Sequence, residues 1–226
     1  MKNLALVTAA GLLAFGAYRM SQRNDIAIVE NGGAGWLGST DGILTSAGQN
    51  TAEFIDTITG GIMKLSNMAG VTAADVTHPN VRALLRVIRV GEGTSGENGY
   101  RIMFGGATFD SYADHPRQKI TKPLGGRKIT STAAGAYQFL SSTWDETRRL
   151  MGLGDFSPAS QDRAAVGRIA ARGALEDAKA GRFDVAIKKI ATEWASMPGS
   201  PYGQPVITLA RARSVFADNG GTINQA

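Results

Sequence analysis

Residues 81–94 read VRALLRVIRVGEGT, a stretch that combines the two faces of one helix with an acid at its end. Apolar residues recur at helical spacing along one face, namely Val81, Leu84, Leu85 and Ile88. Basic residues follow the other face, namely Arg82, Arg86 and Arg89. Beyond Ile88, the next position on the apolar face is Glu92, between Gly91 and Gly93. The stretch therefore predicts an amphipathic helix with a carboxylate in line with its buried face.

Glu92 stands where a carboxyl group is hard to ionise. Burial disfavours the charged form and the helix dipole disfavours it further, so both effects raise the pKa. An acid that stays protonated near neutral pH can protonate the leaving oxygen of an ether-type bond. The alternative is that Glu92 turns outward as a solvated residue. The run from Gly91 to Gly96 also fits G-x-G-x-x-G, but it follows a helix instead of a strand, so we reject a dinucleotide site.

The rest of the C-terminal part predicts an α+β domain dominated by helix. Short apolar and β-favouring runs at 100–109 and 128–132 predict a small sheet or hairpin with long loops. Ser157 followed by Pro158 is a typical start of a helix. Helices are predicted over 133–151, 157–171, 183–197 and 205–217.

Composition excludes several classes of site. The 226 residues include no Cys and only two His, so disulfides, Cys–zinc sites, thiol nucleophiles and an HExxH zinc helix are ruled out. The net charge of +5 is uneven, because residues 1–80 sum to −2 and residues 81–226 to +7. A basic domain is attracted to a polyanion such as nucleic acid, anionic lipid or bacterial cell wall. We expect no cofactor.

Residues 1–20 are predicted to be a membrane anchor or an uncleaved signal segment. Residues 3–18 carry no charge and lie between Lys2 and Arg19, which is typical of a segment that inserts into a membrane. A cleavable signal and an ordinary buried helix are the alternatives.

Residues 21–80 are predicted to be a glycine-rich connector that contains an amphipathic helix over 52–69. The narrow apolar stripe of this helix suits a partner helix, such as one of another virion protein, or a bilayer surface. Packing on the protein's own second part is the alternative. The catalytic domain is assigned to residues 81–226.

Several motifs occur in the order and spacing of one known family. Besides the Glu92-Gly93-Thr94 sequence they are DHPR at 114–117, STAAGAYQFL at 131–140, GDFSPASQD at 154–162 and WASMPGSPYGQ at 194–204. Over residues 81–222 the chain thus resembles the bacteriophage lambda endolysin family. The resemblance implies a lysozyme-like fold and the activity of a murein lytic transglycosylase. In that reaction, Glu92 protonates the leaving oxygen and then takes the proton of the C6 hydroxyl that closes a 1,6-anhydro ring.

The same resemblance implies residues that bind the saccharide. An aromatic face at Tyr137 and an amide at Gln138 suit sugar rings and N-acetyl groups, although Tyr137 could instead be a core residue. Asp114 could bind substrate, or could cap the turn before Pro116, which we favour. The remaining positions carried over from the family are Ser131, Tyr202 and Gln204. A sugar hydroxyl as nucleophile requires no second carboxylate.

The predicted function is that of a phage enzyme that cleaves the β-1,4 bond between N-acetylmuramic acid and N-acetylglucosamine in peptidoglycan. It would act as a lysin tethered to the host inner membrane with its domain in the periplasm, or as a virion-associated lysozyme for genome entry. The alternative is a non-enzymatic virion structural protein, or a membrane- or nucleic-acid-binding protein on a lysozyme scaffold. Because the basic residues are dispersed, we expect no specific nucleic acid partner.

Overall fold

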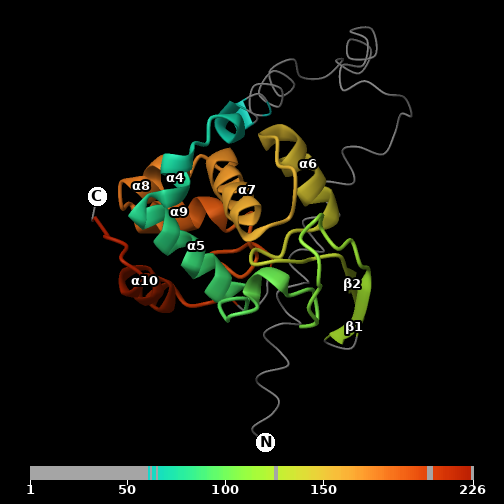
Figure 1. The fold of residues 1–226 in the computed structure, drawn as a ribbon. Helices are drawn as coiled ribbons and strands as arrows, with labels where there is room; N and C mark the ends of the chain where they lie inside the picture. Colours follow the sequence, from blue (N-terminus) through green and yellow to red (C-terminus); the bar gives the residue numbers. More distant parts are fainter. Residues whose placement is uncertain (1–60, 62, 65, 125–126, 203–205, 225–226) are drawn as a thin grey trace, which may run out of the picture.

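The computed structural model describes residues 61, 63–64, 66–124, 127–202 and 206–224. Figure 1 shows a helical body in which α8, α9 and α10 lie at one end and a β-hairpin at the other. The predicted helix-dominated domain with a small sheet is confirmed. Its elements are α4 (Ala73–Thr77), α5 (Pro79–Gly91), a 3-10 turn (Gly99–Arg101), β1 (Ile120–Leu124), β2 (Arg127–Ser131), α6 (Ser141–Met151), α7 (Pro158–Ala171), α8 (Leu175–Lys179), α9 (Phe183–Ile190) and α10 (Leu209–Asp218).

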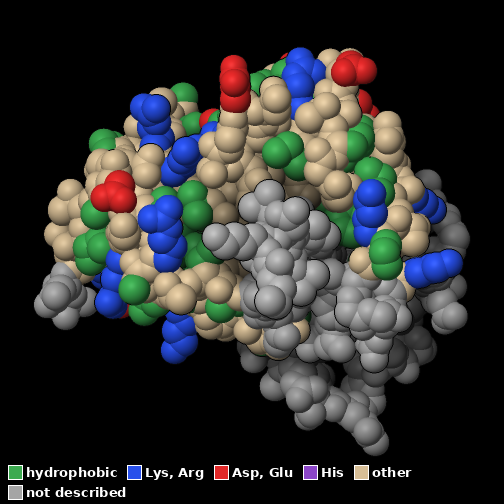
Figure 2. All heavy atoms as spheres, turned by 90° about the horizontal axis from the view of Figure 1, so that it is seen from below, with side chains coloured by type: hydrophobic (Ala, Val, Ile, Leu, Met, Phe, Trp, Pro, Cys, Tyr) green, Lys and Arg blue, Asp and Glu red, His purple; other side chains and the backbone are tan. Residues whose placement is uncertain are grey.

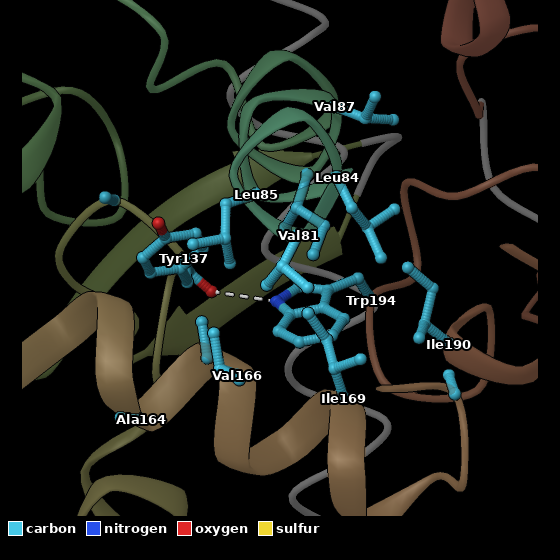
Figure 3. Packing of buried hydrophobic residues seen from close by; sticks show 14 of the residues in the cluster. Val81, Leu84, Leu85, Val87, Tyr137, Ala164, Val166, Ile169, Ile190 and Trp194 are labelled. Carbon is cyan, nitrogen blue, oxygen red and sulfur yellow. Dashed lines mark hydrogen bonds between the residues drawn. The ribbon is translucent and has the colours of Figure 1, made fainter. Parts of the chain in front are cut away.

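Helix α5 forms where the apolar spacing predicts it, and it contacts α4, α7, α8 and α10. Pro79 begins the helix, a position that needs no backbone N–H. Figure 3 shows the side chains of Val81, Leu84 and Leu85 directed toward Trp194 and toward α7. Burying each such side chain contributes about 1.5–3 kcal/mol, so this face fixes α5 at the centre of the domain.

The sheet differs from the prediction in the identity of one strand. Strand β2 confirms the run predicted at 128–132, but its antiparallel partner is β1, with Ile120 opposite Ser131. The run at 100–109 forms only isolated bridges, because Gly105 and Gly106 both adopt positive φ and turn the chain. Pro123 lies within β1, and a two-stranded sheet tolerates it because each strand is an edge.

The helix predicted over 133–151 begins only at Ser141. Residues 134–139 instead form a tight turn in which Ala134 and Phe139 exchange both backbone hydrogen bonds at 2.9 Å. Gly135 and Gln138 have positive φ values of 79° and 48°, which a helix does not allow. This correction has a non-local cause, since the Gln161 side chain of α7 accepts the N–H of Ala136 at 2.8 Å.

Other helix ends agree with the sequence in part. Helix α7 starts as predicted, with the Ser157 hydroxyl accepting the N–H of Ser160. The helix predicted over 183–197 ends at Ile190, and that predicted over 205–217 is α10, which Thr208 caps. The short helices α4 and α8 were not anticipated.

Only part of the N-terminal predictions concerns residues that the structure describes. The predicted anchor, residues 3–18, lies outside them, and in the part of the chain that is described no helix is long and apolar enough to cross a membrane. Of the helix predicted over 52–69, residues 61, 63–64 and 66–69 are helical. Met68 and Val71 belong to the same buried cluster as α5, so this end packs on the protein's own domain. The packed core thus extends N-terminal to residue 81.

We predict that Met68→Ala destabilises the domain by about 2–5 kcal/mol, because it leaves a cavity among fully buried side chains. Met68 is 0% exposed and Met63, on the same helical segment, is 59% exposed. Met63→Ala is therefore the matched control, with little expected change. Urea unfolding of the full chain measures both. Equal stability of the two variants would show that Met68 is not part of the core.

Candidate active site

Glu92 is buried at the C-terminal end of α5, with only 6% of its surface exposed. Its backbone N–H donates to the carbonyl of Ile88 at 2.8 Å, which places the side chain beside the buried face of the helix. The Ser196 hydroxyl donates to Glu92 Oε1 at 2.7 Å. Burial raises the pKa of Glu92 to about 8, and the hydrogen bond from Ser196 partly opposes that rise. The predicted inward placement is confirmed, and the outward alternative is wrong.

Gly91 allows the chain that carries Ser196 to approach the helix end closely. A Cβ atom at Gly91 would lie 2.3 Å from the Met197 side chain and 2.7 Å from Ser196 Oγ. Gly93 has a φ of 70°, which turns the backbone away immediately after Glu92. The two glycines that flank the acid are therefore explained by close packing at Gly91 and by the turn at Gly93, and neither is explained by a phosphate-binding loop.

The short loop after Glu92 is held by the arginine face of α5. Arg86 Nη1 donates to the Ser95 carbonyl at 2.7 Å, and Arg89 Nη2 donates to the Thr94 carbonyl at 3.2 Å. The Thr94 hydroxyl donates in turn to the carbonyl of Ala136, in the turn that precedes α6. Two arginines of the predicted basic face thus fix the backbone of the loop that follows the acid.

Tyr137 lies in the core, which was the alternative to the predicted position in a saccharide cleft. Its ring is 2% exposed and packs in the core, so it offers no face to a saccharide. Its hydroxyl donates to Asp162 Oδ1 at 2.6 Å, and the hydroxyl of Tyr100 donates to the same oxygen at 2.8 Å. Asp162 is not among the predicted site residues, although it ends one of the quoted motifs.

Gln138 and Ser131 hold the turn between β2 and α6. Gln138 Nε2 donates to the carbonyls of Ile102 and Gly135, at 3.0 and 2.9 Å. Ser131 is buried, and its hydroxyl accepts the N–H of Ala133 at 3.1 Å. These contacts give both side chains a structural role, and their binding of substrate stays a prediction.

Asp114 is the centre of a polar cluster on the surface side of the core. Its Oδ1 accepts from Trp144 Nε1 at 3.1 Å and from Arg148 at 3.2 Å, while Arg117 donates to Oδ2 at 3.0 Å. Burial raises the pKa of Asp114, but the hydrogen bonds from the His115 N–H and from Arg117 outweigh it and lower the pKa. These contacts agree with the structural alternative for Asp114.

The remaining predicted residues, Tyr202 and Gln204, follow Ser196 in the chain. The Tyr202 hydroxyl donates to the carbonyl of Thr192 at 2.9 Å, and Gln204 lies outside the described residues. Ser196, which touches the acid, was not predicted, although it lies within a quoted motif. In the described ranges no group of three or more His, Cys, Asp or Glu could hold a metal ion.

The arrangement defines a class of protein. A buried carboxylic acid with a raised pKa, at the end of a central helix, can supply the proton that glycosidic-bond cleavage requires. The domain is therefore that of a lysozyme-like enzyme. A profile of the endolysin family matches residues 82–223, and the chain belongs to that family.

The similarity to known proteins covers most of the length of each relative. The endolysin of Escherichia phage lambda is 39% identical over 150 residues, which is 64% of this chain and 93% of that relative. The endolysin of Escherichia phage P2 is 39% identical over 157 residues, 64% of this chain and 95% of that relative. Bacteriophage lambda lysozyme, solved in complex with a chitohexasaccharide, superposes with a TM-score of 0.60 at 38% identity, over 65% of this chain and 97% of that one. A second structure of lysozyme from bacteriophage lambda gives 0.57 at 37% identity, with the same coverage.

We predict that Glu92→Gln stabilises the fold increasingly as pH rises. The pKa of Glu92 is about 8 when folded, against an ordinary value of 4.5. Between these values the folded state binds more protons than the unfolded state, so wild-type stability falls as pH rises through that window. Glutamine does not ionise, so its advantage grows from near zero at about pH 4 to about 4 kcal/mol at about pH 8.

Urea unfolding of the full chain across that pH range measures this difference. Glu97→Gln, the same change on the exposed part of the following loop, controls for the loss of one acidic residue. A Glu92→Gln advantage that does not change with pH would show that Glu92 is ionised in the folded protein.

Proposed function

We propose that this chain degrades peptidoglycan by cleaving the β-1,4 bond between N-acetylmuramic acid and N-acetylglucosamine, as a lytic transglycosylase. The observation that carries the proposal is the buried Glu92 acid, which is protonated below about pH 8 and has Ser196 as its hydrogen-bond donor. The chitohexasaccharide bound to lambda lysozyme supports a β-1,4-linked amino sugar as the substrate class.

The proposed reaction needs one carboxyl group. Glu92 donates its proton to the glycosidic oxygen as the bond to C1 breaks, and the resulting carboxylate accepts the proton of the C6 hydroxyl. The C6 oxygen bonds to C1 and closes a 1,6-anhydro ring, so no water enters. Ser196 donates a hydrogen bond that stabilises the carboxylate between the two steps.

The surroundings of Glu92 support this mechanism over a covalent one. A retaining glycosidase with a covalent intermediate places its second carboxylate about 5 Å from the first. A carboxylate so close would raise the pKa of Glu92 by repulsion. Among the residues that the structure describes, burial is the cause that raises it, and Ser196 is the hydrogen-bond partner.

We predict that the full chain releases 1,6-anhydro muropeptides from purified peptidoglycan, and that Glu92→Gln lowers the rate by at least about 100-fold. The reason is that glutamine keeps the shape of the side chain but has no proton to give. Mass spectrometry of the products measures both, and Glu97→Gln is the matched control that keeps activity. Products with reducing ends would identify a hydrolase, and an active Glu92→Gln would disprove the assigned acid.

The alternative is a protein with no enzymatic activity that binds a polyanion such as nucleic acid or anionic lipid, and it would require a surface on which basic residues gather. On the face drawn in Figure 2, Lys and Arg side chains are scattered among other residues and do not gather into one stripe. Such a distribution does not favour a dedicated polyanion site. A folded full chain that yields no products would nevertheless support this alternative.

We also propose that the protein acts at the host inner membrane with its domain in the periplasm, or as part of the virion during entry. The support is the uncharged run 3–18. We predict that the full chain sediments with membranes and that a variant lacking residues 1–20 does not, because the apolar run supplies the affinity. Both keep residues 61–71, so the domain core is equal in the two. A full chain that stays in the supernatant would contradict the anchor, and its presence in purified virions would favour the entry role.

A further inference from the structure

A buried ion pair lies under the segment that carries Ser196. Arg168 of α7 is 1% exposed, and its Nε donates to Glu193 Oε1 at 2.6 Å. The second oxygen of Glu193 accepts from Arg172 Nε at 2.7 Å. Both oxygens of Glu193 are therefore bound to arginines, one within α7 and one directly after its end. Removing Arg168 would leave the buried Glu193 with Arg172 as its remaining described partner, and removing Glu193 would leave the buried Arg168 with Glu146. Proteins tolerate such a loss of pairing at a buried charge poorly.

Residues 191–197 have no helix of their own to fix them, since α9 ends at Ile190. Within this segment the Trp194 Nε1–H donates to the Tyr137 carbonyl at 3.3 Å, a contact marked in Figure 3. The Ser196 carbonyl accepts the N–H of Ile207 at 3.0 Å. Glu193 is thus the charged anchor of a non-helical segment, three residues before the serine that contacts the acid.

We propose that the Arg168–Glu193 ion pair positions the segment 193–197 so that the Ser196 hydroxyl donates to Glu92. Arg168 and Glu193 are positioning residues, because neither touches the acid or the reacting sugar. The inference rests on the proposed function in one respect, the role of Glu92 as the acid.

The charges around the pair come from three elements. Glu146 of α6 accepts from Arg168 Nη1 at 2.8 Å, Arg172 directly follows the last residue of α7, and Lys64 lies 3.9 Å from Glu146. Within the described part of the chain, burial and the Ser196 hydrogen bond are what act on the pKa of Glu92, so the charges of the ion pair do not act on it directly. An effect of Glu193 on the titration of the acid must then pass through the position of Ser196.

The experiment compares the pH dependence of kcat/KM for the full chain, Ser196→Ala, Glu193→Gln and the double variant on purified peptidoglycan. Loss of a hydrogen bond to the carboxylate raises the pKa of Glu92, so Ser196→Ala should move the alkaline limb of the profile upward by about one pH unit. Glu193→Gln should move it in the same direction, because glutamine cannot accept from both arginines. The double variant should move it no further than Ser196→Ala alone.

Asp184→Asn is the matched control. It breaks an exposed ion pair with Arg213 between α9 and α10, away from residues 193–197, and should leave the profile unchanged. A folded Glu193→Gln with the wild-type profile would overturn the proposal, as would an unshifted Ser196→Ala. Circular dichroism establishes folding.

If Glu193→Gln does not fold, the pair Arg168→Met with Glu193→Leu carries the same measurement, because replacing both charges leaves no buried ion of the pair unpaired. A shifted alkaline limb in that variant supports the positioning role, and a wild-type profile overturns it. Failure of the proposed function is distinguishable, since it shows as an active Glu92→Gln. Failure of this inference alone shows as an inactive Glu92→Gln with an unshifted Glu193 variant.

Discussion

A neutral carboxyl group buried at the end of a helix is the constraint that the surrounding residues serve. Glu92 lies where burial disfavours its charge, and one hydroxyl, that of Ser196, is directed at it. Gly91 admits the serine's segment, since any side chain there would collide with it. On the other side of the helix end, Arg86 and Arg89 hold the loop that follows the acid. A cost in folding stability is accepted at this site, as is usual where a group is kept protonated for chemistry.

The N-terminal turns of α7 connect the loops around residues 100 and 136. Gln161 accepts the N–H of Ala136 and donates to the carbonyl of Tyr100, so it joins two loops that no sheet connects. The next residue, Asp162, receives the hydroxyls of Tyr100 and Tyr137. Adjacent side chains of a single helix thus add to the few backbone hydrogen bonds between these loops, such as that from the Gly135 N–H to the Ile102 carbonyl, and the small hairpin can remain peripheral.

The sequence predicts what local spacing determines and misses what distant residues impose. The 3.6-residue period located α5 and the inward position of Glu92, and Ser157 with Pro158 located the start of α7. The turn at 134–139 was read as helix because its cause, Gln161, is remote in the chain. Ser196 and the Arg168–Glu193 pair carry no local pattern, since their partners are chosen by the fold.

Met68 shows that the unit shared with relatives and the unit that folds have different boundaries. Similarity to the endolysin family begins at residue 82, yet Met68 and Val71 are buried in the same core as α5. An N-terminal extension whose side chains are buried in this core is structurally part of the enzyme and not only a tether. Proteolysis between residue 71 and α5 would therefore not liberate a finished domain, because the released piece would expose an apolar hollow. Any evolutionary exchange of this catalytic module must transfer the extension with it or refill that hollow.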